Sequence, residues 1–85
     1  MIDSTTRKRV VAYREDNQIR IKLYSFGDMA LLEDHLYYKL GIEIDSFKPI
    51  KDSNGKVIGS ELIYEEFKDV DLLQSIIDEF EITEE

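Results

Sequence analysis

The hydrophobic residues of this chain change their spacing from a period of two to a period close to that of a helix. In residues 18–26, QIRIKLYSF, Ile19, Ile21 and Leu23 alternate with other side chains, which is the pattern of a strand with one buried face. Over residues 29–40 the apolar side chains instead recur every three or four positions, which is typical of an amphipathic helix. The pattern therefore predicts a strand that is followed closely by a helix.

The second half of the chain repeats this plan. Asn54 and Gly55 form a dipeptide favoured in two-residue hairpin turns, where both residues need positive φ. Pro49 has no amide hydrogen to donate to a neighbouring strand, so its own strand is expected to lie at a sheet edge or to end there. The expected elements are strands over residues 7–14, 18–26, 42–50 and 57–67, and helices over residues 29–40 and 70–80, the first with Ser25 or Asp28 as N-cap.

These elements give the order ββαββα and an α+β fold class. Each helix has one strongly apolar side, so the economical arrangement is one four-stranded antiparallel sheet with both helices on one face. As geometry alone, this connectivity is a circular permutation of the ferredoxin-like βαββαβ arrangement. We expect a single domain over residues 1–85 with flexible tails at residues 1–6 and 82–85. Its stability is expected to be modest, because a chain of this size buries only about 60–65% of its unfolded surface.

Composition restricts the environment and the chemistry. The chain has no cysteine, which excludes disulfides, thiolate nucleophiles and cysteine-based zinc sites, and which fits a reducing cytoplasm. The longest apolar runs have only three or four residues, so we expect no membrane contact through a spanning segment. The basic residues of the opening MIDSTTRKR are not followed by the apolar run of a signal peptide. We therefore expect a cytoplasmic protein.

The single histidine, His35, lies within the segment ALLEDHLYYKL and raises the question of proton or metal chemistry. A general base usually needs an orienting partner, and the neighbours of His35 on its helix provide little of that. A metal ion needs further ligands at matching spacing, but the chain has no second histidine and no cysteine. We therefore interpret His35 as a boundary or interface residue, ahead of a titrating functional group and of a metal ligand.

No other motif predicts catalysis or a bound cofactor. The segment KDSNGKVIGSE matches a calcium loop at four positions, but Ile50 stands at the first ligand position, and the flanking segments read as strands. A hairpin turn is the better interpretation. Gly55 and Gly59 are not followed by the Lys-Ser/Thr pair of a phosphate-binding loop. We expect a non-enzymatic protein with no catalytic residue, no cofactor and no metal.

The predicted first helix carries more apolar surface than one sheet contact requires. The stripe expected to face the sheet comprises Met29, Leu32, Leu36 and Leu40. Further apolar and aromatic side chains flank this stripe and widen the apolar arc. Exposed apolar patches usually mark interfaces, so we predict that this surplus contacts a partner protein's groove or a second copy in a homodimer. The residues predicted for this contact are Leu31, His35, Tyr37 and Tyr38.

Charge is unevenly distributed along the chain. The net charge is −8, and it divides into +3 over residues 1–22 and −11 over residues 23–85. Such an acidic body attracts basic partners and repels nucleic acid and anionic lipid. We therefore predict a protein-interaction module that regulates or inhibits a basic partner, with an electrostatic contact on the second helix at Asp71, Asp78 and Glu79. The other interpretations are that this acidic surface is simply solvated, or that it mimics nucleic acid.

The basic N-terminal portion supports an alternative function. Arg20, Lys22 and Tyr24 share the outward side of the alternating strand, where cations and an aromatic ring would suit single-stranded nucleic acid. Exposed strands also favour these residue types without any ligand, and a dimer would bury such a face. We favour the interpretation that the basic portion pairs with the acidic remainder within the fold.

Overall fold

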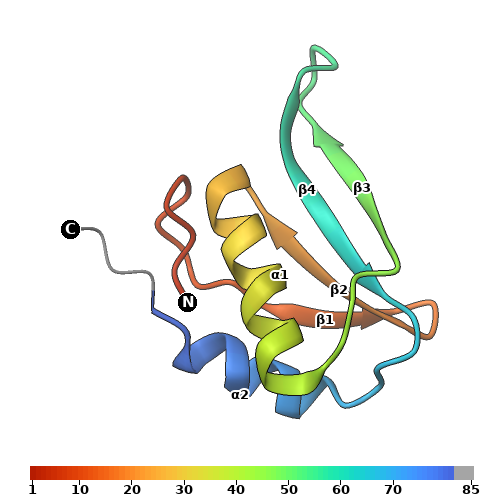
Figure 1. Ribbon diagram of the computed structural model, residues 1–85. Helices are drawn as coiled ribbons and strands as arrows, with labels where there is room; N and C mark the ends of the chain where they lie inside the picture. Colours follow the sequence, from red (N-terminus) through yellow and green to blue (C-terminus); the bar gives the residue numbers. More distant parts are fainter. Residues whose placement is uncertain (82–85) are drawn as a thin grey trace.

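The computed structural model describes residues 1–81, which form four strands and two helices in the predicted order ββαββα (Figure 1). The strands make one antiparallel sheet in the order β1-β2-β4-β3, so the predicted α+β class and permuted connectivity are confirmed. The elements are β1 (Ala12–Glu15), β2 (Gln18–Leu23), α1 (Phe26–Leu40), β3 (Ser46–Lys51), β4 (Val57–Tyr64) and α2 (Val70–Glu79).

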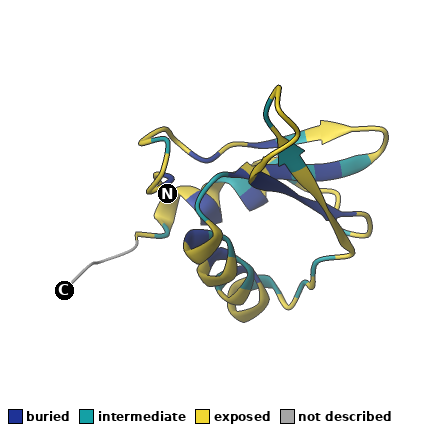
Figure 2. Ribbon diagram, turned by 90° about the horizontal axis from the view of Figure 1, so that it is seen from above, coloured by how far each residue is buried: buried dark blue, intermediate teal, exposed yellow. Residues whose placement is uncertain are grey.

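Both helices cover the same face of the sheet because the strand register gathers the apolar side chains there. Ile19 pairs with Tyr64, and Ile21 pairs with Leu62, so the inward residues of the two central strands share one face. Figure 2 shows that α1 and the sheet turn their buried residues toward each other. The helices contribute Leu32, Leu36, Leu73, Ile76 and Ile77 to this core.

Local sequence accounts for the turns and the helix ends. Asp16 and Asn17 join β1 to β2 with φ of 51° and 63°, the paired positive values of a tight hairpin turn. Gly41 ends α1 with φ of 66°, and its amide donates to the carbonyl of Tyr37. Ser25 is the N-cap, since its side chain accepts from the amide of Asp28, so α1 begins three residues earlier than expected.

The N-terminal segment is the main correction to the prediction. Residues 1–6 were expected to form a flexible tail, but Met1 and Asp3 are buried and the segment packs against the domain. Asp3 lies at the end of β2, where its carboxylate accepts hydrogen bonds from backbone amides that no strand partner satisfies. The strand expected over residues 7–14 accordingly begins only at Ala12. The tail predicted at residues 82–85 lies outside the described residues.

The hairpin formed by β3 and β4 extends past the helices (Figure 1). The position of β3 at the sheet edge confirms the expectation drawn from Pro49. The register slips between Ile50 and Lys51, which pair with Gly59 and Val57, respectively. A Cβ atom at Gly59 would lie 2.6 Å from the carbonyl oxygen of Leu23, so the close approach of the end of β2 to β4 requires glycine there.

Candidate protein-binding site

The outward face of α1 carries the apolar surplus expected from the sequence. Leu31 is 46% exposed, Tyr37 is 58% exposed and Tyr38 is 81% exposed. At about 100° per residue, these side chains and Asp34 occupy one continuous arc, opposite the buried Leu32. We call this arc, formed by Leu31, Asp34, Tyr37 and Tyr38, the tyrosine face.

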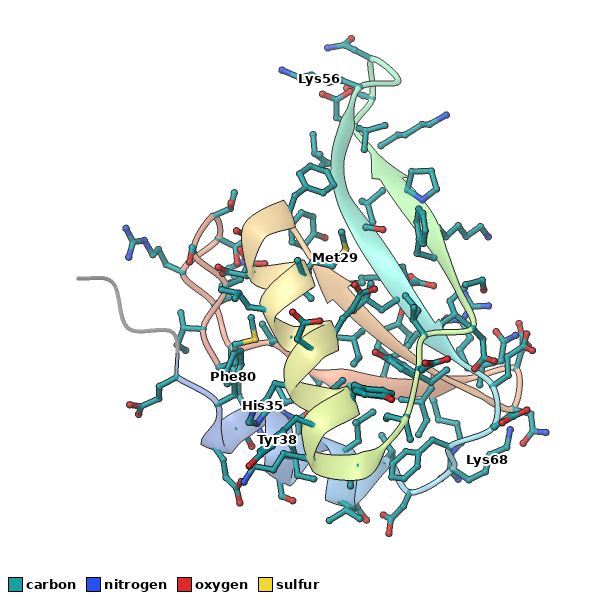
Figure 3. The ribbon with its side chains drawn as sticks, in the orientation of Figure 1. Met29, His35, Tyr38, Lys56, Lys68 and Phe80 are labelled. Atoms are coloured by element: carbon teal, nitrogen blue, oxygen red, sulfur yellow. The ribbon has the colours of Figure 1, made fainter. Side chains whose placement is uncertain are left out.

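His35 lies at the margin of this face and packs against the end of α2 (Figure 3). Its ring stacks on Phe80 with 4.2 Å between the ring centroids and 17° between the planes. Burial, and then the charge of Lys39, lowers the pKa of His35, although the charge of Glu79 opposes this shift. His35 is therefore a neutral packing residue between the two helices, and Tyr38 extends beyond it.

The acidic residues predicted for α2 do not form one free surface. Asp78 accepts two hydrogen bonds from Arg9, at 3.0 and 2.7 Å, and one from Gln74. The hydrogen bond from Arg9 is the largest cause that lowers the pKa of Asp78 to about 2. Asp71 and Glu79 are exposed, but Asp78 forms an ion pair with Arg9. The basic N-terminal portion thus pairs in part with the acidic remainder of the chain.

A second acidic region, which the sequence analysis missed, lies beside Tyr37. A hollow of about 560 Å³ opens between the end of α1, residues 41–45 and the segment that follows β4. A second hollow of about 340 Å³ adjoins it and shares Tyr37 and Glu43. We call the two hollows together the acidic cleft. Its carboxylates are Glu33, Asp34, Glu43, Asp45 and Glu66, and its aromatic residues are Tyr37, Tyr64 and Phe67.

A buried tyrosine and a partly buried glutamate line the acidic cleft. Tyr64 is 1% exposed, and its hydroxyl finds no hydrogen-bond partner among residues 1–81. Burial, followed by the charges of Glu33 and Asp45, raises the pKa of this hydroxyl. Burial and the neighbouring Asp34 likewise raise the pKa of Glu33. The cleft therefore gathers five carboxylates, of which only Glu33 is partly buried, and this negative charge attracts cations.

The cleft escaped the sequence analysis because its residues come from three separate segments. Only contiguous acidic residues and residues on one helix face were considered together. Tyr64 offered one signal, since it occupies an inward position of its strand and brings a hydroxyl into an apolar core. A buried hydroxyl needs a partner, and that requirement would have directed attention to the residues opposite it.

The outward side of the sheet differs from the predicted basic and aromatic face. Arg20 is largely buried and donates to Glu61 at 2.7 Å, while Tyr13 donates to the same carboxylate. Although burial raises the pKa of Glu61, these hydrogen bonds outweigh burial and lower it. Lys22 remains exposed, 5.5 Å from the centre of the Tyr13 ring. The charge of Arg20 is thus neutralised within the fold.

Tyr24, the third residue of the predicted nucleic-acid surface, lies just beyond the end of β2. Its amide donates to Asp3 at 2.7 Å, and its ring lies against Gly59. Tyr24 therefore has a structural role where the N-terminal segment meets the sheet. Lys22 and Tyr24 still line one open hollow on this side of the molecule.

Within the described part of the chain, no three histidine, aspartate or glutamate side chains are placed to hold a metal ion together. None of the helices formed by residues 1–81 has the length and apolar character needed to cross a bilayer. Comparison with protein-family models, curated proteins and solved structures found no match to this chain.

Proposed function

We propose that the protein is a small, non-enzymatic interaction module that binds a basic protein through the tyrosine face and the adjoining acidic cleft. The observation that carries this proposal is the exposure of Tyr38, which leaves a large aromatic ring 81% accessible beside Leu31 and Tyr37. Tyrosine is enriched among the residues that dominate binding energy at protein interfaces. A net charge of −8 draws the module toward a basic partner.

The size of the molecule indicates how much of its surface such a contact would use. A standard interface buries about 800 Å² on each partner, which is about one-seventh of the 5659 Å² surface of this domain. One helix face is small for this purpose, so the partner would also contact the cleft beside Tyr37. By covering that area of the partner's surface, the module would regulate or inhibit the partner without catalysing a reaction.

Affinity purification from an extract of the source organism tests the proposal. The double variant L31A/Y38A removes the apolar part of the tyrosine face, and F47A is the matched control because Phe47 is exposed on β3. We expect a basic protein to be retained by the wild type and by F47A but not by L31A/Y38A. Equal retention by all three proteins would refute the role of this face. A homodimer dissociated by L31A/Y38A, with no basic partner, would show self-association in place of the proposed function.

Single-stranded nucleic-acid binding is the second candidate. The hollow on the outward side of the sheet measures about 500 Å³ and is lined by Lys8, Lys22, Tyr13 and Tyr24, among others, which favours this alternative. Arg20 is less informative as a test, because its loss would leave Glu61 without a charge partner. The variant K8E/K22E should abolish retention of a single-stranded oligonucleotide at low salt. Failure of the wild type to bind under those conditions would end this candidate.

A further inference from the structure

The hairpin of β3 and β4 carries apolar side chains that the fold itself does not cover. We call residues 46–58 the arm, because this part of the hairpin extends past the helices (Figure 1). Phe47 pairs with the fully buried Leu62, so both side chains lie on the helix-covered face of the sheet, yet Phe47 is 69% exposed. Val57 and Ile58 are also exposed. The arm therefore continues the apolar surface of the sheet beyond the cover of the helices.

The arm is basic within an acidic protein. It contains three lysines and one aspartate, a net charge of +2, whereas the whole chain has a net charge of −8. Among the described residues, none of the ammonium groups of Lys48, Lys51 and Lys56 forms an ion pair. Asp52 accepts from the amides of Asn54 and Lys56 within the turn, at 2.9 and 3.0 Å. The positive charge of the arm is therefore available to a binding partner.

The arm is poorly suited to the addition of another strand, although β3 forms an edge of the sheet. Pro49 has no amide hydrogen to give to an added strand, and the register slips between Ile50 and Lys51. Lysine, proline and bulges at a sheet edge all oppose pairing with a further strand. A partner would therefore contact the side chains of the arm and not its backbone.

The tyrosine face complements the arm in both charge and apolar character. Residues 29–45, which include this face, contain four acidic residues and one lysine, a net charge of −3. The exposed rings of Tyr37 and Tyr38 offer contacts to an aromatic side chain such as Phe47 and also attract ammonium groups. Both surfaces belong to the same chain, so a second copy of the protein carries the surface that each of them lacks.

We infer that the arm of one copy of the protein docks on the tyrosine face of a second copy. The apolar residues of the arm pack against the tyrosine rings, and its lysines lie beside the carboxylates of that region. The contact joins two different surfaces, so it is heterologous. The inference rests on the part of the proposed function that makes the tyrosine face a binding surface, but it needs no basic partner. When such a partner is present, it competes with the arm for the face.

Sedimentation velocity of the full chain, at micromolar to millimolar concentrations, measures self-association. K51E and R7E each reverse one positive charge on an exposed side chain, but Arg7 lies in the N-terminal segment, outside both surfaces. We expect K51E to weaken self-association at least about fivefold and R7E less than about twofold. Equal effects of the two variants would show diffuse electrostatics and contradict the inference. A wild type that stays monomeric would also overturn it.

Mixing two variants identifies which surfaces meet. F47A/K51E has an altered arm and an intact tyrosine face, whereas L31A/Y38A has the reverse. All four side chains are exposed, so both variants should melt like the wild type. We expect each variant alone to remain monomeric and an equimolar mixture to associate, because each supplies the surface that the other lacks.

Three results of the mixing experiment would refute the contact. If two tyrosine faces met, F47A/K51E would associate by itself. If two arms met, L31A/Y38A would associate by itself. A mixture that stays monomeric would show that the arm and the tyrosine face do not bind each other.

The inference and the proposed function fail separately. Capture of a basic protein from an extract reports the proposed function, and F47A/K51E should retain that protein because its tyrosine face is intact. If F47A/K51E self-associated like the wild type while L31A/Y38A lost the basic protein, the inference would fail and the proposed function would stand. If the mixture associated as expected but no basic protein depended on the tyrosine face, the proposed function alone would fail.

Discussion

Asp3 provides the sharpest test of how the N-terminal segment is held in place. Its Oδ1 accepts from the amides of Thr5 and Thr6 at 2.8 and 3.1 Å. Its Oδ2 accepts from the amides of Tyr24 and Ser25 at 2.7 and 3.4 Å. The variant D3N preserves the shape of the side chain but replaces one oxygen with an NH₂ group. One pair of amides would then face a donor in place of an acceptor.

The expected loss of stability follows from the hydrogen bonds that D3N removes. Each pair contains one short and one longer hydrogen bond to a buried carboxylate, and a hydrogen bond to a charged group contributes about 1.5–3 kcal/mol. We therefore expect D3N to lower the free energy of unfolding by about 2–4 kcal/mol. A domain of this length has a stability of about 4–13 kcal/mol. The melting temperature should fall by about 10–30 °C.

Urea denaturation followed by circular dichroism measures this loss, with D34N as control because Asp34 is exposed on α1. Although burial raises the pKa of Asp3, its hydrogen bonds from backbone amides lower it overall. A folded-state pKa below the unfolded value of about 3.9 stabilises the fold above that pH, and this stabilisation is lost as the pH falls. The difference between wild type and D3N should therefore shrink below pH 4. A D3N variant as stable as D34N at pH 7 would refute this account.

Two further predictions concern glycine and histidine. G59A should destabilise the domain by about 1–3 kcal/mol in urea denaturation, because its Cβ would lie 2.6 Å from the carbonyl oxygen of Leu23. G27A is the matched control: a Cβ at Gly27 would meet no atom within 4 Å, so this variant should raise stability by about 0.5–1 kcal/mol. A G59A variant of unchanged stability would show that the strands can separate there at no cost. The imidazole of His35 should titrate below pH 6.5 in a proton NMR experiment, since burial against Phe80 disfavours the charged form. Because the folded pKa is lowered, the free energy of unfolding should fall as pH decreases from 6.5, and a titration midpoint above 6.5 would contradict this assignment.

Local pattern was sufficient to predict the elements and their arrangement. The alternation of Ile19, Ile21 and Leu23 predicted a strand with one buried face. The helical spacing that follows predicted a helix whose apolar side packs on that face. Pro49 indicated the edge correctly. Such features are readable because they depend on residues a few positions apart, whose side chains share a face whenever the element forms.

The same reasoning predicted which side chains of α1 would remain outside the core. Tyr37 and Tyr38 fall on the arc opposite Leu32 and Leu36, and both are exposed in the structure. Whether a partner covers them stays a prediction, because the helical pattern describes which residues face outward and not what meets them. The burial of His35 against Phe80 required the packing of α1 on α2, which no local spacing specifies.

The amino-acid sequence by itself determined the order of elements, the apolar face of each and the uneven distribution of charge. Only the tertiary structure decided which charges are free. It bound Asp3 to the end of β2, paired Arg9 with Asp78 and placed Asp45 and Glu66 in the lining of one hollow. The physical reason is range: hydrophobic periodicity acts between neighbours on one element, whereas the state of a charged group depends on whichever distant residues the folded chain places beside it.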